Sequence, residues 1–308
     1  MIRGPLRDRC RGRWHGILVA LGIDHRYLSR KHGPCPICPG GRDRWRFLDT
    51  DGAGTWICTH CGGGDGFDLV MRFSSLPFKD AAQRIEAVLG DIVPSSPRRD
   101  RSERQIRAGL NSIWSKATLI RRSDVVDRWL RSRDIILHTF PSCLRMARRL
   151  PYYGSATRSY HPAMLALVRG SDGRPATIHR TYLTEVGSKA AVDSPRKLYS
   201  AMPTGAAVRL GEPAATLGIA EGIETALAAQ ILFSVPTWAA ICANGLANFE
   251  PPQNVKRLLI FADNDDNHVG QQAALKLASR LSGDLKVETI IPPDIGQDWN
   301  DVLSHSGH

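Results

Sequence analysis

The chain has 308 residues and a formal charge of +11, which is enough length for one sizeable core and a smaller module. Residues 1–160 contain 29 Lys and Arg against 15 Asp and Glu, whereas residues 161–308 contain 12 against 15. The basic, Arg-rich front half suggests a polyanionic partner, and the acidic back half suggests a carboxylate site. Seven cysteines, four of them in two Cys-x-x-Cys pairs, argue against a secreted disulfide framework. We therefore expect a reduced, cytoplasmic protein.

The first 90 residues are expected to form a small domain built around those cysteine pairs. Apolar residues at helical spacing predict a short helix over 14–21 and a second over 78–89, ended by Gly90. Between them, residues 33–66 are rich in Gly, Cys and Pro and have no helical period. A polar, Pro-containing stretch over 91–104 predicts a linker, and two helices are expected before residue 150. The expected domains are therefore 1–90, a linking helical segment 91–150, and a larger domain 151–308.

The cysteine pairs predict a structural zinc site. Cys35 and Cys38 form one knuckle and Cys58 and Cys61 the other, and two knuckles supply the four thiolates of a tetrahedral Zn²⁺ shell. Four protein ligands leave no open coordination position, so the metal is expected to stabilise the fold and not to catalyse. The alternative is four unrelated buried cysteines.

Three arginines alternate with aromatic residues between the knuckles. The order Arg42, Arg44, Trp45, Arg46, Phe47 has period 2, which places the arginines on one face of a strand and the aromatics on the other. We expect the aromatics to fill the small core, and we interpret the arginines as candidates for binding single-stranded nucleic acid.

From about residue 164 the pattern changes to short β runs that alternate with helices. Helices are expected over 223–232 and 269–281, and strands over 216–220, 257–262 and 285–291. Alternating strands and helices predict an α/β domain with a mostly parallel sheet flanked by helices. The uncharged stretch 225–249 is interrupted by polar residues and Pro, so a buried helix followed by a strand fits better than a membrane span.

Acidic residues follow two of the predicted strands. Glu221 directly follows the apolar run LGIA (217–220). Asp263 and Asp265 follow the run LLIFA (258–262), and a helical pattern comes after each acidic group. Parallel sheets place ligands at the carboxyl ends of their strands, and converging carboxylates suit Mg²⁺. The alternative for each single acid is a helix N-cap. Asp298 and Asp301 form a third acidic cluster that could reach the same edge, with Asp298 favoured as a cap.

These motifs resemble those of phage- and plasmid-type DNA primases. The segments EGIETALAA (221–229) and FADNDDNHVGQQAA (261–274) resemble the Toprim domain shared by primases, topoisomerases, nucleases and RecR-type proteins. The cysteine segment 32–71 resembles the zinc ribbon of such primases, and residues 161–183 and 194–200 resemble the segment that precedes their Toprim domain.

The resemblance implies a nucleotidyltransferase that makes RNA primers on single-stranded DNA for replication of a phage, plasmid or mobile element. It implies that Glu221, Asp263 and Asp265 are catalytic Mg²⁺ residues. It also implies that Arg196 and Lys197 face nucleotide and template. Glu224 lies three positions after Glu221 and not four, which turns it by about 100° on a helix, so no metal is assigned to it.

Two other function classes share parts of this pattern. A RecR-like recombination mediator also joins a four-cysteine zinc module to a Toprim domain, and it would bind DNA without catalysis. A Toprim nuclease usually accompanies an ATPase, but the chain has no G-x-x-x-x-G-K-[ST] motif. We therefore expect the primase, with single-stranded DNA and ribonucleoside triphosphates as partners, a separate replicative helicase as a candidate partner, and no membrane.

Overall fold

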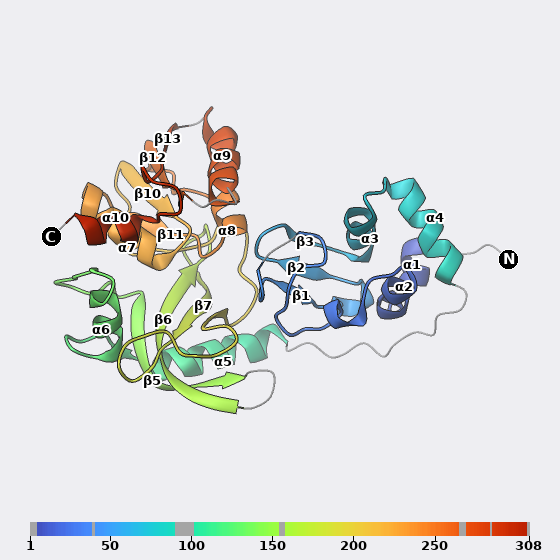
Figure 1. Cartoon of the computed structure of the whole chain (residues 1–308), viewed down its shortest axis with the longest axis horizontal. Coiled ribbons are helices and arrows are strands. Elements are labelled where there is room, and N and C mark those ends of the chain that lie inside the picture. The colour runs from blue at the N-terminus through green and yellow to red at the C-terminus, as the bar shows by residue number, and fades with distance from the viewer. Residues whose placement is uncertain are drawn as a thin grey trace. The chain divides into compact units, whose positions relative to one another are not determined.

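The computed structural model describes residues 5–38, 41–89, 102–153, 158–264, 269–283 and 285–306. It divides into two compact units, Met1–Ser102 and Glu103–His308, which are described separately (Figure 1). Most of the expected linker lies outside the described residues. Within them, no helix combines the length and the apolar character that crossing a bilayer requires.

The smaller unit packs four helices around a three-stranded antiparallel sheet of order β1-β2-β3. Its elements are α1 (Leu6–Cys10), α2 (Trp14–Ala20), η1 (His25–Tyr27), β1 (Trp45–Phe47), η2 (Thr50–Gly52), β2 (Trp56–Cys58), β3 (Gly62–Gly64), α3 (Gly66–Ser74) and α4 (Phe78–Leu89). Both helices predicted from apolar spacing are confirmed. Most of their periodic residues are buried in one core with Trp45, Phe47 and Trp56, whereas Phe78 is 55% exposed.

Trp14 is the centre of this small core, and two glycines make room for it. A Cβ on Gly54 would lie 2.5 Å from Cγ of Trp14, and a Cβ on Gly66 would lie 2.1 Å from its Cδ2. The edge of the Trp14 ring also meets Phe67 at a centroid distance of 4.9 Å. Helix α3 begins beside this contact with a capping box between Asp65 and Asp68. The glycine run before α3 forms the third strand of the ribbon.

The larger unit is built on one mixed sheet, whose order is β13-β12-β10-β11-β9-β6-β5-β4, with β7 pairing with β6 and β8. Its strands are β4 (Thr118–Leu119), β5 (Leu144–Tyr153), β6 (Arg158–Arg169), β7 (Pro175–Tyr182), β8 (Arg196–Leu198), β9 (Ala207–Val208), β10 (Thr216–Ala220), β11 (Thr237–Ala239), β12 (Arg257–Phe261) and β13 (Lys286–Ile290). Its helices are α5 (Glu103–Lys116), α6 (Val125–Arg131), α7 (Ile223–Phe233), α8 (Ala243–Ala247), α9 (Val269–Leu281) and α10 (Trp299–His305).

The four strands β10 to β13 pair in parallel, and helices cover both of their faces. Leu259 and Phe261 of β12 pack with α7 and α10, whereas Leu258 and Ile260 pack with α8 and α9. This period-2 division of one apolar strand is what a sheet buried on both sides requires. The predicted parallel sheet with flanking helices is therefore confirmed for this part of the chain.

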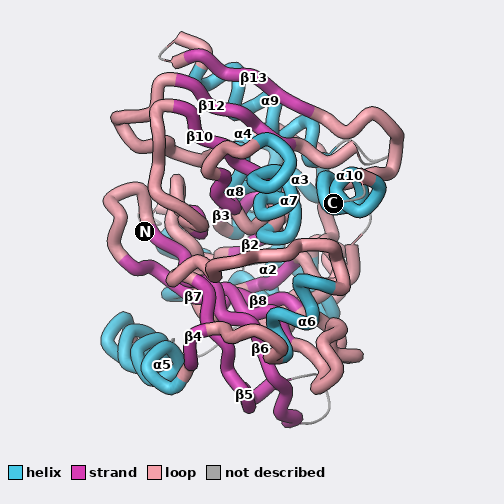
Figure 2. Tube along the Cα trace, turned by 90° about the vertical axis from the view of Figure 1, so that its left-hand side faces the viewer, coloured by secondary structure: helices cyan, strands magenta, loops and turns pink. Residues whose placement is uncertain are grey.

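The other half of the sheet is antiparallel and contains a long strand, β5, that sequence patterning did not predict. Its pairing with β6 shifts register between Ala147 and Leu150. A bulge there turns the strand, so Leu144 packs in the core beneath α6 and α7, while Leu150 packs in the separate cluster beneath α5. Figure 2 shows α5 beside this antiparallel half, apart from β10, β12 and β13.

Candidate zinc and carboxylate sites

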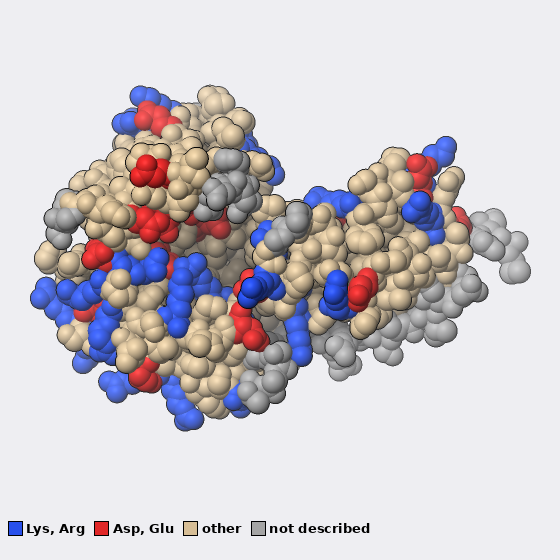
Figure 3. All heavy atoms as spheres, viewed as in Figure 1, with Lys and Arg blue, Asp and Glu red and all other residues tan. Residues whose placement is uncertain are grey.

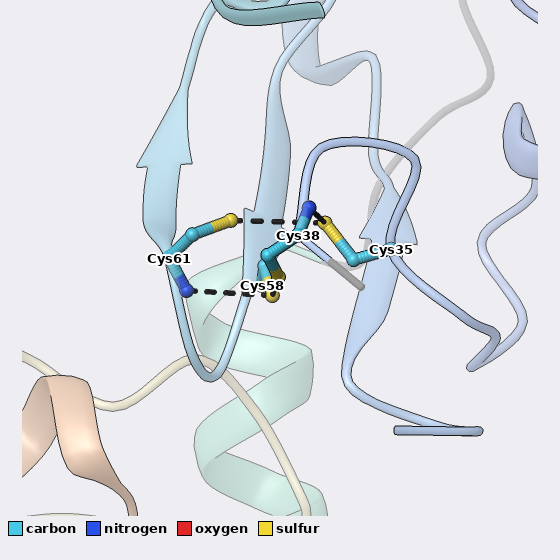
Figure 4. Close-up of side chains that lie close together, drawn as sticks. All are labelled: Cys35, Cys38, Cys58 and Cys61. Atoms are coloured by element: carbon cyan, nitrogen blue, oxygen red, sulfur yellow. Dashed lines mark hydrogen bonds between the residues drawn. The ribbon is translucent and has the colours of Figure 1, made fainter. Parts of the chain in front are cut away.

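The four predicted zinc ligands converge in the smaller unit. Their sulfur atoms all lie within 4.8 Å of one another. The Sγ atoms of Cys35 and Cys61 are 3.7 Å apart, and those of Cys38 and Cys58 are 3.8 Å apart. A tetrahedral Zn²⁺ with bonds of about 2.3 Å separates its sulfur ligands by about 3.8 Å, so the spacing fits zinc. Figure 4 shows the four side chains turned toward one another.

Backbone N–H groups hold the sulfur atoms in each knuckle. Cys35 Sγ accepts hydrogen bonds from the N–H groups of Ile37 and Cys38 at 3.3 and 3.5 Å. Cys58 Sγ accepts equivalent bonds from the N–H groups of His60 and Cys61 in its own knuckle, at 3.4 and 3.5 Å. Hydrogen bonds from the thiols of Cys58 and Cys61 lower the pKa of Cys35, and donating those bonds to Cys35 raises the pKa of Cys58 and of Cys61. Four thiolates at this spacing therefore need a cation, which is how a zinc shell is normally completed.

The aromatic residues between the knuckles are buried as expected, but of the three arginines only Arg46 lies on a strand. Trp45 and Phe47 are buried in β1, and Trp45 stacks on Trp56 at a centroid distance of 5.0 Å. Arg46 lies on the opposite, half-exposed face of the same strand, and Arg42 and Arg44 precede it in the loop. The aromatics therefore form the ribbon core, and nucleic-acid binding by the three arginines stays a prediction.

Glu221 lies at the carboxyl end of β10, as predicted. The register pairs Ala220 of β10 with Phe261 of β12, so Glu221 and Asp263 begin the loops after two neighbouring parallel strands. The carbonyl oxygen of Glu221 accepts a hydrogen bond from the N–H of Ile241 at 2.7 Å, which ties this loop to the end of β11 as well. The side chain of Glu221 is half-exposed.

Asp263 is positioned by contacts on both sides of its neighbour Asn264. The Oδ1 atom of Asn264 accepts a hydrogen bond from Gln271 of α9 at 2.9 Å, and its backbone N–H donates to the carbonyl of Gln297 at 2.9 Å. Gly270, near the start of α9, lies beside the Asp263 backbone, but a Cβ there would make an ordinary contact at 3.8 Å from the Asp263 nitrogen, so this approach does not require glycine. The strand end is therefore fixed between α9 and the β13–α10 loop. Asp265 lies outside the described residues.

The third acidic cluster caps a helix. Asp298 Oδ1 accepts hydrogen bonds from the N–H groups of Asn300 and Asp301, and Asp301 in return accepts one from the Asp298 N–H at 2.9 Å. This reciprocal arrangement is a capping box at the start of α10. Asp298 therefore acts as the cap that the sequence favoured.

Sequence reasoning missed the partner of Glu224. This carboxylate is buried on α7 and forms an ion pair with Arg196 of β8, whose side chain is 45% exposed against 6% for Glu224. Burial alone would raise the pKa of Glu224, but Arg196, the backbone N–H and Lys189 outweigh that effect and lower it. One indication was present in the sequence: Glu224 lies three positions after Glu221 and not four, which points its side chain away from the expected metal edge.

Arg196 and Lys197, the basic pair that begins β8, are each fixed by a contact with another element. Lys197 Nζ lies 4.1 Å from the ring centroid of Tyr152 and donates to the carbonyl of Tyr153 at 3.3 Å. His179 of β7 is buried beside Arg196, and burial and the nearby arginine lower its pKa to about 4. Arg196 thus joins β8 to the start of α7, close in the chain to Glu221.

Three family models match the chain. Residues 30–67 match a zinc-binding domain of primase-helicase, residues 216–308 match a Toprim domain, and residues 104–210 match a domain of unknown function, DUF7146. The match to the zinc-binding domain spans the four cysteines, and the match to the Toprim domain spans Glu221 and Asp263. An N-terminal zinc ribbon of the primase-helicase type and a C-terminal Toprim domain are therefore confirmed.

Several solved primase structures are similar to the chain at low identity. The Aquifex aeolicus primase fragment with zinc-binding and RNA polymerase domains is 14% identical, over 98% of this chain and 82% of that one, with a TM-score of 0.41. The primase fragment of the bacteriophage T7 primase-helicase is 14% identical, over 90% and 95%, with a TM-score of 0.40. The DnaG catalytic core is 12% identical, over 66% and 75%, with a TM-score of 0.46. All three TM-scores are below 0.5, so the domain assignments depend on the family models.

Proposed function

We propose that this chain is a DNA primase, which synthesises short RNA primers on single-stranded DNA. The observation that carries the proposal is a primase-helicase-type zinc domain joined to a Toprim domain in which Glu221 and Asp263 follow adjacent parallel strands. The substrates of such an enzyme are ribonucleoside triphosphates and a DNA template. The reaction belongs to the cytoplasm and to replication of a phage, plasmid or mobile element.

Primer synthesis joins a 3′-hydroxyl to an α-phosphate, and positioning and charge neutralisation account for most of the catalysis. In this proposal Asp263 and Asp265 hold Mg²⁺, which when bound supplies charge neutralisation at the phosphates. Glu221 acts as a further ligand or accepts the proton of the attacking hydroxyl. Carboxylates at the end of β10 and β12 and an oxygen-rich donor set fit a hard divalent cation.

Arg196 and Lys197 are proposed to bind phosphate. Glu224 fixes the position of the Arg196 guanidinium but leaves almost half of that side chain exposed, so donors remain accessible to an anion. A fixed guanidinium loses less conformational entropy on binding than a freely rotating one. Glu224 is therefore a positioning residue in this scheme.

The zinc ribbon is proposed to bind the single-stranded template through Arg42, Arg44 and Arg46. Replacing all three with Gln should lower affinity for an oligodeoxynucleotide and reduce the salt slope of log K by roughly 0.7 for each phosphate that is no longer neutralised. Fluorescence anisotropy at several salt concentrations measures both quantities. Arg26→Gln, an exposed arginine outside the knuckles, is the control. Unchanged affinity and slope would remove the ribbon arginines from the template site.

The direct test of the function is RNA synthesis by the purified protein on single-stranded DNA with ribonucleoside triphosphates and Mg²⁺. The proposal predicts short labelled transcripts that require the template, the triphosphates and the metal together. The recombination-mediator alternative predicts DNA binding without transcripts under every condition. A helicase partner is suggested by the description of the zinc-domain family, and stimulation of synthesis by an added replicative helicase would support it.

A further inference from the structure

A polar cavity of about 460 Å³ lies in the larger unit, away from the carboxylate edge. Arg145, Arg169 and Arg209 line it together with Trp114, Trp238 and Glu212. Glu212 precedes β10, so the cavity lies toward the amino end of that strand, whereas Glu221 follows its carboxyl end. Its volume falls within the usual range of small-molecule sites.

Aromatic rings and backbone carbonyls hold the three arginines in place. The Arg145 guanidinium lies 4.5 Å from the Trp114 ring centroid, and that of Arg209 lies 4.7 Å from the Trp238 ring centroid. Arg209 Nη2 also donates to the carbonyl of Gly170 at 2.8 Å, and Arg169 Nη1 donates to a carbonyl of the same loop. The guanidinium groups are therefore positioned by neutral partners, which leave their charge in place.

Among the described residues no ion pair neutralises this cluster, although the Glu212 carboxylate lines the same cavity. Within the part of the chain that the structure describes, no carboxylate lies within 4 Å of a nitrogen of Arg145, Arg169 or Arg209. The Nε atoms of Arg145 and Arg209 are buried and make no hydrogen bond with a described residue. Burial and then the proximity of Arg169 lower the pKa of Arg209, and Asp172 and Glu212 offset part of that effect from a distance.

We propose that this arginine cavity binds the phosphate group of a nucleotide or of a nucleic-acid backbone, at a site separate from the Toprim carboxylates. Three arginines line this one cavity and Arg169 acts electrostatically on Arg209, so an anion bound there would offset their positive charge, and planar N–H forks match phosphate oxygens. Stacking on Trp114 and Trp238 already fixes the side chains of Arg145 and Arg209, so a phosphate that binds their accessible Nη groups costs little conformational entropy. The proposal does not depend on the proposed primase reaction, because its test measures binding of phosphate-containing ligands and not RNA synthesis.

Variants and two probes test the proposal in the full-length protein without Mg²⁺. The probes are ATP, followed by titration calorimetry, and a fluorescein-labelled oligodeoxythymidylate, followed by anisotropy. Arg169→Gln and Arg209→Gln should each lower affinity for at least one probe by about tenfold or more, because each removes a charge-assisted hydrogen bond. Arg209→Lys should restore only part of the affinity, because it returns the charge without the planar fork.

Arg149→Gln is the matched control. Arg149 lies on the same strand as Arg145 and stacks on Tyr160 at 4.2 Å, but it is exposed and does not line the cavity. A loss confined to ATP identifies a nucleotide site, and a loss confined to the oligonucleotide identifies a backbone site. If both cavity variants match Arg149→Gln for both probes, the proposal is overturned.

A measurement on the unmodified sequence covers the case in which a variant does not fold. Phenylglyoxal modifies accessible guanidiniums, and mass spectrometry of peptides reports the rate at each arginine. The bound probe should slow modification of Arg169 and Arg209 several-fold relative to Arg149. Equal rates with and without both probes would contradict the proposal regardless of the variants.

Discussion

The zinc site and the carboxylate edge differ in what brings their side chains together. The cysteines of each knuckle are held by the turn that contains them, whereas the acids of the carboxylate edge are brought together by strand pairing. Each zinc knuckle is a single turn whose own N–H groups orient its sulfur atoms. Glu221 and Asp263 instead become neighbours only because β10 and β12 pair in parallel. A site of the first kind depends on its metal for stability, whereas one of the second kind depends on the sheet and is retained without its metal.

Figure 3 shows a second difference between regions, within the larger unit. On the face shown, Lys and Arg side chains spread over the part built from β5, β6 and α6, while acidic groups lie closer to the parallel strands. On this face the antiparallel part is thus the more basic of the two, although Arg257 and Lys286 lie on parallel strands. The arginine cavity and the carboxylate edge follow this division.

Removing zinc should have the largest effect and should separate the two sites most clearly. Cys58→Ser is expected to lower zinc content from one ion per chain to none and to unfold the ribbon, since structural zinc contributes roughly 10–16 kcal/mol of apparent binding free energy. Metal analysis and circular dichroism measure the two effects, and the thermal transition of the larger unit should persist. Cys10→Ala, a buried cysteine of the same unit outside the cluster, should retain zinc. Full zinc content in Cys58→Ser would contradict the four-cysteine site.

Breaking the Arg196–Glu224 pair should have the next largest effect, and it tests how the larger unit is held together. Arg196→Ala leaves the buried Glu224 carboxylate without its main counterion, so the free energy of unfolding should fall by about 3 kcal/mol. Glu224→Gln should cost less, because the Arg196 left behind is partly exposed and can be solvated. Chemical denaturation of both variants measures the difference, and equal losses would show that burial of Glu224 does not matter.

Much of this could be predicted from the sequence, and the exceptions have physical causes. The cysteine set, the ribbon aromatics and the acids after β10 and β12 depend on local spacing, which patterning detects. Strand β5 was missed because its bulge moves successive apolar residues between two different cores. The Arg196–Glu224 pair was missed because it joins a strand to a helix through sheet order, which no local period contains.

His179 gives a smaller, pH-dependent effect in the same region. Its folded pKa of about 4 lies below the ordinary value of 6.5, so the unfolded chain binds the proton more readily. Stability should therefore fall as the pH is lowered from about 6.5 toward 4, by at most about 1.4 kcal/mol per pH unit from this residue. His179→Gln should flatten the dependence of unfolding free energy on pH in that window. Parallel curves for the two proteins would exclude His179 as the source.

The central claim, that the carboxylate edge catalyses primer synthesis, is tested most directly by Asp263→Ala. The measurement is template-dependent RNA synthesis, with zinc content and DNA affinity measured on the same preparation. We predict that transcripts disappear while zinc content and DNA affinity stay unchanged, and that Asp294→Ala, an exposed acid of the adjacent β13–α10 loop, keeps full synthesis. Undiminished synthesis by Asp263→Ala would contradict the account.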